Sequence, residues 1–345
     1  MFRTVLGVVF ASIVVAGVAW AGAVNQQTVV VYSPHGQDML TDMTEQFVKE
    51  TGIRMEFLAM GGGEIVDRLR AEKDNAQADI MYGNPSSVFV ELKQQGLWQP
   101  FTPTWAKELE SYFKDADGTW FGTIQTPVFI FYNNKTLSAA NAPKDWWELI
   151  DPKYHDQLIF RSTTSAASRA TFACLMYQFD KKGTLQTEGW SFFRKLDANT
   201  KRHVYNSSLM FQAIARGEAS MGFWILSDIT DSVTKNNMPF TIVNAASGSP
   251  VITDAIALVK GAKHPEAAKK FIEFAGRPAT QAQLAVKYSR MPTHPDALRQ
   301  APAWMKQLTY KVMDVDWTRL SQKQSEWLQY YEDNIRDAAK VQKQQ

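Results

Sequence analysis

The chain has 345 residues, of which 45% are hydrophobic. This is enough to bury one large core or two of ordinary size, so we expect two domains. Lys and Arg total 37 against 35 Asp and Glu, and so balanced a chain lacks the basic field that would attract a nucleic acid. The single cysteine, Cys174, excludes an intrachain disulfide and lies in an apolar run, which predicts a buried, inert thiol.

The N-terminus has the layout of a secretory signal peptide. Arg3 precedes an apolar run over residues 5–18, and small residues follow at Ala19 and Ala21. A membrane anchor is the alternative, but spanning a bilayer takes roughly 20 apolar residues and this run is shorter. We therefore interpret residues 1–23 as a cleaved signal peptide, which predicts a periplasmic protein.

After this segment, strand and helix patterns alternate three times. Each predicted strand is followed by a loop of Gly, Ser, Pro or Asn and then by apolar residues at helical spacing. These strands cover residues 28–32, 53–59 and 79–82. The first helix is expected to end at Gly52 and the third at Gly96. Three successive βα units predict a parallel sheet with helices on its faces.

Residues 120–133 form a run of β-branched and aromatic residues that contains Pro127. Because this run is longer than one ordinary strand, we interpret it as a segment that crosses between two lobes. A second α/β set follows, and residues 252–259 are strand-like again, which predicts the return crossing. The strands predicted for the second set cover residues 158–160, 203–206, 219–224 and 240–244.

These patterns predict an α/β protein of two lobes, with the two crossing segments as its hinge. The first lobe is expected to comprise residues 27–125 and 253–345, and the second lobe residues 126–252. The remaining C-terminal residues have a mainly helical pattern. Only the Lys- and Gln-rich tail after Ala339 is predicted to be disordered.

Ligands of open α/β sheets bind beyond the carboxyl ends of the strands, where loops lead into helices with unpaired backbone N–H groups. Four loops of this sequence fit that description and offer hydroxyls, an imidazole, a guanidinium or glycine-exposed backbone to an anion. For any single hydroxyl, capping of its own helix is an equally good explanation. The candidate ligand-binding residues in these loops are Ser33, His35, Gly62, Gly63, Glu64, Asn84, Ser86, Thr163, Thr164, Ser165, Ser168 and Arg169.

Further candidates lie in the second lobe and in the hinge. Ser207 repeats the loop pattern before a predicted helix, and Trp224 and Asp228 lie just beyond a predicted strand. There an indole could stack on a ligand and a carboxylate could hydrogen-bond to it, although core packing is the default for a tryptophan. Thr126 and Asp254 complete the set from the two crossing segments.

No pattern in the chain indicates catalysis or a resident metal. The sequence contains no Gly-x-Ser-x-Gly, His-Glu-x-x-His, Cys-x-x-Cys or Gly-x-x-x-x-Gly-Lys, and its five histidines lack the spacing of metal ligands. We therefore expect no catalytic residues, no metal and no cofactor. A periplasmic hydrolase of phosphate esters is the enzymatic alternative.

Several short motifs occur in an order that covers nearly the whole chain after the signal. They are Val31-Tyr32-Ser33-Pro34-His35, Gly63-Glu64, Ala78-Asp79-Ile80-Met81, Tyr132-Asn133-Asn134, Asp151-Pro152-Lys153-Tyr154, Ala215-Arg216-Gly217-Glu218 and Asp316-Trp317. In this order they resemble the type II periplasmic binding proteins of ABC importers. The nearest group, of iron(III) type, includes receptors for hexose phosphates, phosphoglycerate and aminoalkylphosphonates. The resemblance implies the two-lobed fold of this family.

Iron-binding members of this group hold the metal with adjacent tyrosines near the strand that here reads Gly222-Phe223-Trp224-Ile225-Leu226. No tyrosine stands there, and phenolate oxygens are what a hard ferric ion needs. Tyr330 and Tyr331 lie on a predicted helix, where adjacent side chains diverge. In the sugar-phosphate receptors the second-lobe loop is rich in Ser and Thr, as residues 162–168 are, although the usual glycine and proline are missing here.

We therefore expect a monomeric periplasmic receptor that closes around a small anionic solute, phosphorylated or a phosphonate. It would deliver this solute to an ABC permease in the inner membrane. A ferric-ion receptor is the alternative for the ligand. A receptor that reports to a sensor kinase is the alternative for the output, and nothing in the sequence of the receptor separates the two outputs.

Overall fold

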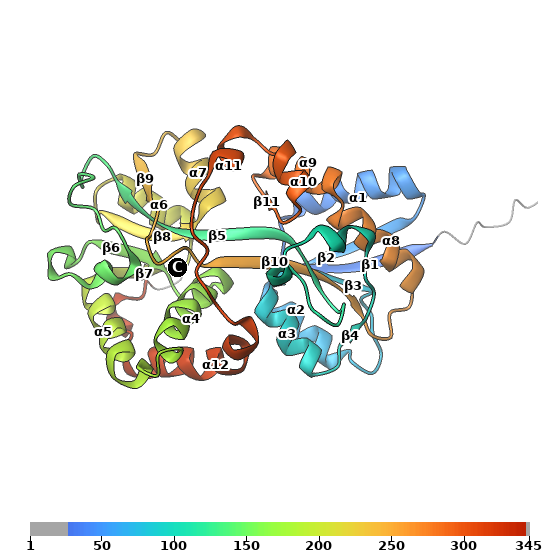
Figure 1. Cartoon of the computed structure of the whole chain (residues 1–345), viewed down its shortest axis with the longest axis horizontal. Helices are drawn as coiled ribbons and strands as arrows, with labels where there is room; N and C mark the ends of the chain where they lie inside the picture. The colour runs from blue at the N-terminus through green and yellow to red at the C-terminus, as the bar shows by residue number, and fades with distance from the viewer. Residues whose placement is uncertain (1–26, 343–345) are drawn as a thin grey trace, which may run out of the picture.

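A computed structural model describes residues 27–342. Two lobes lie side by side and share one sheet, which confirms the predicted two-lobed α/β fold (Figure 1). The strand order is β2-β1-β3-β10-β5-β8-β6-β7, with β4, β9 and β11 paired beside this path. The interpreted signal peptide, residues 1–23, lies outside the described residues. Within residues 27–342, no helix is both long and apolar enough to cross a membrane.

The first lobe is built from the three predicted βα units. β1 pairs in parallel with β2 and with β3, as the βα pattern predicted. β10 (Val251–Val259) is antiparallel to β3, so the sheet is mixed, because β10 returns from the other lobe instead of following a βα unit. The units comprise β1 (Thr28–Ser33), α1 (Gln37–Thr51), β2 (Arg54–Ala59), α2 (Gly62–Ala71), β3 (Ile80–Pro85), α3 (Ser86–Gln94) and β4 (Trp98–Gln99).

One strand, β5 (Phe121–Asn133), runs through both lobes. Residues 121–127 pair antiparallel with β10 in the first lobe, and residues 128–133 pair with β8 and β9 in the second. From its length, this run was expected to be more than one ordinary strand. It is one continuous strand, because its two halves take different partners at Pro127, and the Val128 N–H donates to the Pro250 carbonyl at 2.8 Å.

The second lobe surrounds the other half of the sheet. β6 pairs in parallel with β7 and β8, while β8 and β9 are antiparallel to β5. α5 was not predicted from the sequence. The elements are β6 (Leu158–Arg161), α4 (Ala166–Asp180), α5 (Trp190–Asn199), β7 (Thr200–Val204), α6 (Ser207–Ala215), β8 (Met221–Ile225), α7 (Leu226–Thr234) and β9 (Phe240–Val243), with short helical turns at Thr104–Glu108, Ser111–Phe113, Trp146–Ile150, Pro152–Tyr154 and Leu185–Gly189.

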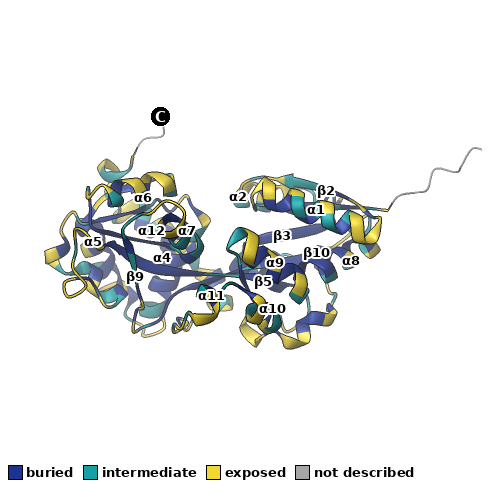
Figure 2. Cartoon of the chain, turned by 90° about the horizontal axis from the view of Figure 1, so that it is seen from above, coloured by how far each residue is buried: buried dark blue, intermediate teal, exposed yellow. Residues whose placement is uncertain are grey.

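Each lobe has its own aromatic core, and the central strands of both lobes are buried while the outer faces of the helices are exposed (Figure 2). In the first lobe Phe47 packs edge-on against Phe271, with ring centroids 5.4 Å apart. In the second, Phe160 stacks on Phe223 at 4.8 Å. Cys174 is fully buried in the second core, and burial raises the pKa of its thiol, as expected of an inert cysteine.

The C-terminal third returns along both lobes. α8 packs on β1 and β10 of the first lobe, whereas α12 contacts α4 of the second lobe as well as α3 of the first. Residues 253–345 were all expected in the first lobe, but a helical pattern does not show which lobe a helix packs against. The elements are α8 (Pro265–Gly276), α9 (Pro278–Tyr288), β11 (Met291–Pro292), α10 (Pro295–Gln300), α11 (Ala303–Gln307), α12 (Trp317–Asn334) and a final turn at Ala338–Lys340.

The tail after Ala339 was predicted to be disordered, and for residues 340–342 this prediction is wrong. Val341 forms a parallel bridge with His203 of β7, and the Gln342 N–H donates to the His203 carbonyl at 2.9 Å. These tertiary partners order a segment whose own composition is polar. Residues 343–345 lie outside the described part of the chain.

Candidate ligand-binding cleft between the lobes

A cavity of about 420 Å³ lies where the two lobes face each other, a volume that suits a small molecule. The first lobe lines it with Gly62, Gly63 and Asn84, from the start of α2 and the end of β3. The second lobe contributes Thr164 from the loop that leads into α4 and Arg169 from the first turn of that helix. Five of the predicted ligand-binding residues therefore meet in one cavity.

The helices that begin at this cleft are not capped by their own N-cap side chains. α1, α2, α3 and α4 follow Gly36, Gly61, Pro85 and Ser165, and none of these four residues makes a side-chain capping hydrogen bond. The first-turn N–H groups of a helix are donors with partial positive charge. The capping alternative raised for these loops therefore does not account for Ser165.

His35 is 8% exposed, and its Nε2 atom has no hydrogen-bond partner within residues 27–342. Its ring packs edge-on against Tyr82 at 4.9 Å. Burial and the nearby positive charge of Arg290 lower the pKa of His35 to about 3, so the imidazole is neutral. Gly83 adopts φ +99°, and a Cβ atom there would lie 2.9 Å from Nε2, so the close approach of β3 to this ring requires glycine.

Asn84 and Gly62 hold two first-lobe loops together. Asn84 adopts φ +82°, and its Nδ2 donates to the Gly62 carbonyl at 3.1 Å. A Cβ atom on Gly62 would lie 2.2 Å from Asn84 Oδ1, so only glycine permits this contact. Beside them Ser86 Oγ is buried and has no partner among the described residues. Ser33 is also buried, and its Oγ accepts from the His35 N–H at 3.2 Å.

In the second lobe, the loop over residues 162–165 leads from β6 into α4. Ser168 Oγ is fully buried without a hydrogen-bond partner in the described chain. Arg169 is exposed at the cavity and forms none of the ion pairs found within residues 27–342. Thr163 has a different environment, since its hydroxyl donates to Glu332 of α12.

A second, smaller cavity lies where β5 crosses between the lobes, and it contains a charged residue that the sequence pattern did not predict as part of the site. Arg290, between α9 and β11, lines a small cavity with Thr126. Its Nε is buried without a partner, and its guanidinium forms no ion pair within residues 27–342. No local signal marks Arg290, because it becomes part of the cleft only when β11 pairs with β5.

Two carboxylates lie within range of the Arg290 charge. Burial raises the pKa of Asp254 to about 6, while Arg290 and a hydrogen bond from Thr126 act in the opposite direction. Burial also raises the pKa of Asp228, against hydrogen bonds from Trp224 and Ser227 and the charge of Arg290. Arg290 is therefore the cationic group shared by both lobes at the hinge.

Two predicted site residues, Glu64 and Ser207, do not line the cavity. Glu64 is exposed and accepts a hydrogen bond from the Gly61 N–H at 2.9 Å, which caps α2. Asn206 caps α6 by accepting from the Ser208 N–H at 2.7 Å, so the hydroxyl of the adjacent Ser207 is not needed as the cap, and Ser207 does not line the cavity.

Trp224 is 4% exposed, and its Nε1–H donates to Asp228 Oδ2 at 2.8 Å. The guanidinium of Arg161 lies over the Trp224 ring, 4.9 Å from its centroid. The indole thus packs under two polar groups at the edge of the second-lobe core. In this structure Trp224 orients Asp228 and Arg161, and its ring face is occupied.

The tyrosine pair of α12 does not meet at the cleft. Tyr330 packs against Trp190 with centroids 4.5 Å apart, and Tyr331 is buried against Phe172 at 4.9 Å. The two side chains diverge because neighbours on a helix point in different directions.

Comparison with known proteins agrees with this architecture. A family model described as bacterial extracellular solute-binding protein matches residues 42–310. A relative from Sinorhizobium fredii, provisionally named an ABC transporter periplasmic-binding protein, is 32% identical over 313 residues, which covers 90% of this chain and 87% of that protein. A relative from Salmonella typhimurium, provisionally named a 2-aminoethylphosphonate-binding periplasmic protein, is 26% identical over 256 residues, with 73% of each chain covered.

Among solved structures, the apo ferric ion-binding protein A of Pasteurella haemolytica has a TM-score of 0.80 at 18% identity, covering 91% of this chain and 99% of the other. At that identity the likeness concerns the fold. The matched relatives are periplasmic, in agreement with the predicted location. From the family match and the similarity along most of its length, this chain belongs to the bacterial extracellular solute-binding proteins.

Proposed function

We propose that this protein is the receptor of an ABC importer and captures a small metabolite bearing a phosphate or phosphonate group in the cleft between its lobes. The observation that carries this proposal is the Arg290 guanidinium, which lies where the lobes join and forms no ion pair within residues 27–342. The side chain is half-buried, its Nε atom has no hydrogen-bond partner there, and Asp254 and Asp228 act on it only through their charges. A partly desolvated cation is stabilised by a direct counter-charge, which an anionic ligand would supply.

Other unpaired donors support an anionic ligand. His35 Nε2, Ser86 Oγ and Ser168 Oγ are buried without partners in the described chain, and Arg169 adds a second guanidinium at the cavity. Such groups bind phosphate oxygens through charge-assisted and neutral hydrogen bonds. Micromolar affinity requires about −8 kcal/mol, which several of these contacts in a closed cleft can supply.

The mechanism follows from the two strands that join the lobes. β5 and β10 cross side by side near Thr126 and Asp254, and a change of backbone angles there would move one lobe relative to the other. First-lobe donors would hold one part of the ligand, and the α4 loop would complete the cage on closure. The closed form would then dock on the inner-membrane permease as a monomer.

The relatives support both this ligand class and its alternative. The name of the Salmonella relative refers to a phosphonate, and the fold neighbour from Pasteurella binds ferric ion. In this chain Tyr330 and Tyr331 face the second-lobe interior and Trp190, so this adjacent pair of phenolates is not at the cleft. This observation favours the phosphate or phosphonate group.

A thermal-shift screen of the purified protein tests the proposal, since a ligand that binds only the folded state raises the melting temperature. The probes are fructose 6-phosphate, 3-phosphoglycerate, 2-aminoethylphosphonate, citrate and ferric citrate. Stabilisation by a phosphate or phosphonate at micromolar concentration is the expected result. Stabilisation by ferric citrate alone would show that the ligand class is wrong.

A parallel assay for released phosphate addresses catalysis. The same phosphate esters are incubated with the protein, with and without divalent cations. Ligands that stabilise the protein should be recovered intact. Metal-dependent release of phosphate would show that the protein is a periplasmic hydrolase and that the receptor proposal is wrong.

A further inference from the structure

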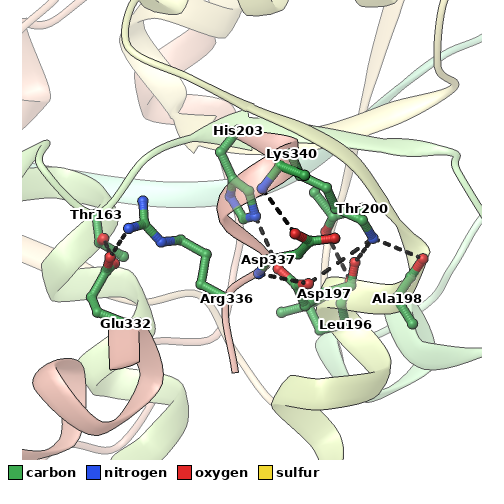
Figure 3. A network of polar contacts seen from close by, with 11 residues as sticks. Thr163, Leu196, Asp197, Ala198, Thr200, His203, Glu332, Arg336, Asp337 and Lys340 are labelled. Atoms are coloured by element: carbon green, nitrogen blue, oxygen red, sulfur yellow. Dashed lines mark hydrogen bonds and ion pairs between the residues drawn. The ribbon is translucent and has the colours of Figure 1, made fainter. Parts of the chain in front are cut away.

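The C-terminal helix reaches into the second-lobe ligand loop. The Thr163 hydroxyl donates to Glu332 of α12, 169 residues away in the sequence, and the other carboxylate oxygen of Glu332 pairs with Arg336 at 2.5 Å. Figure 3 shows the three side chains in a row, from the loop to the end of α12. Thr163 is 5% exposed, so removal of the Glu332 carboxylate would leave its buried hydroxyl without this hydrogen bond.

Glu332 stands on a helix that is fixed to the second lobe at several points. The neighbouring Tyr331 is buried against Phe172 of α4. Beyond the helix, the Asp337 N–H donates to Asp197 Oδ2 at 3.2 Å and Lys340 donates to the Asp197 carbonyl (Figure 3). The carboxylate of Glu332 is therefore held in place independently of the loop that it contacts.

α12 also borders the cleft itself. Gln324 and Ser325 line the same cavity as Thr164 and Arg169, and the helix packs against both α3 and α4. One helix thus forms part of the cavity wall and, two turns later, holds the loop from which the second-lobe donors project.

The charges in this chain of contacts explain why a carboxylate is tolerated beside a site for an anion. An isolated Glu332 would repel a phosphate, but Arg336 neutralises it at 2.5 Å. The neutralised carboxylate of Glu332 therefore acts on the loop as a hydrogen-bond acceptor for Thr163. With the Thr163 hydroxyl occupied, the loop presents the uncapped start of α4 and the unpartnered Ser168 Oγ as its donors.

We propose that Glu332 is a positioning residue of the ligand site: through its hydrogen bond from Thr163 it holds the loop between β6 and α4 in the form that binds the anion. This inference rests on the proposed function and assigns a role to a residue that does not touch the ligand. It predicts that the acceptor at position 332, and not its charge, is what binding requires.

The test compares Glu332→Ala, Glu332→Gln, Thr163→Val and the double variant Thr163→Val/Glu332→Ala. Glu326→Ala on the same helix is the control, because Glu326 is an exposed residue paired with Lys323 at 3.7 Å. Affinity is measured by calorimetry with the phosphate or phosphonate probe that stabilises the wild type most. Hydrogen exchange of residues 162–169 is measured without any ligand.

Glu332→Ala should weaken binding about tenfold, as loss of one buried hydrogen bond does, and should speed exchange in residues 162–169. Glu332→Gln, which keeps an acceptor, should retain affinity within about threefold. In the Thr163→Val background, Glu332→Ala should cost little more, because the two residues act through one contact. Glu326→Ala should change neither measurement.

A lower melting temperature for Glu332→Ala, with unchanged affinity and unchanged loop exchange, would overturn the inference and leave only a structural role for the residue. Additive effects of the two single substitutions would overturn it as well. If the wild type binds none of the probes, the proposed function fails, and the exchange measurement still decides whether Glu332 orders the loop.

Discussion

The charge of Arg290, at the junction of α9 and β11, acts to lower the pKa of three groups of the site: His35, Asp254 and Asp228. No other side chain among residues 27–342 acts on more than one of these three groups. Arg290→Gln should weaken binding of the stabilising probe 10- to 100-fold, since a charge-assisted hydrogen bond contributes about 1.5–3 kcal/mol. Calorimetry measures this. Arg299→Gln, an exposed arginine paired with Asp296, is the control, and equal affinity in both variants would remove Arg290 from the site.

His35 should make stability depend on pH. Its folded pKa of about 3 lies below the unfolded value of about 6.5, so the unfolded chain binds the extra proton between these limits and stability falls as the pH falls through this window. The contribution has a limiting slope of about 1.4 kcal/mol per pH unit. Urea unfolding of wild type and His35→Gln from pH 7 to pH 4 measures it. The variant should lose less stability, and parallel curves would contradict the prediction.

At the scale of elements, the cleft depends on how α4 begins. Ser165 leaves the helix without a side-chain cap, and Ser168 and Arg169 follow in its first turn. Had the loop been used only to cap α4, its hydroxyls would be bonded to the helix N–H groups. The start of α4 thus retains donors that a capped helix would have lost.

Arg169→Ala should reduce affinity about tenfold while changing the melting temperature of the unliganded protein little, because an exposed arginine without an ion pair contributes little to stability. Ser168→Ala should reduce affinity and leave or raise stability, since it removes a buried hydroxyl without a partner. The matched control is Arg194→Ala, an exposed arginine of α5. Unchanged affinity in both loop variants would remove the α4 start from the ligand site.

For the whole molecule, the arrangement of two lobes on one continuous sheet makes closure the expected response to a ligand. Spin labels at Asp67→Cys on α2 and Leu209→Cys on α6, both exposed positions in different lobes, should show a shorter and narrower distance distribution when a stabilising probe is added. Cys174 is fully buried and should stay unlabelled. A pair within the first lobe, Lys49→Cys and Asp67→Cys, should not change; an unchanged pair between lobes would contradict closure.

Much of the architecture could be predicted because the signals are local. Strand and helix periodicity, glycine at Gly52 and the loops after the strands are each encoded by a few adjacent residues. These patterns predicted His35 and Asn84 near the ends of strands and Arg169 near the start of a helix, which is where the structure has them. Glu64 and Ser207 show the same local pattern without lining the site with their side chains, because helix capping and ligand binding call for the same residue types.

Local patterns in the amino-acid sequence were enough to predict the alternation of strands and helices, the two-lobed α/β class and export. Only the tertiary structure decided which charged groups stay unpaired in the cleft, as Arg290 does, and which hydroxyls are already bonded, as Thr163 is. It also decided that α12 packs against α3 of the first lobe and α4 of the second, and that the final turn packs on the second lobe. The physical reason is that a periodic pattern shows which face of an element is apolar, whereas partners more than 100 residues apart are chosen by how the elements pack.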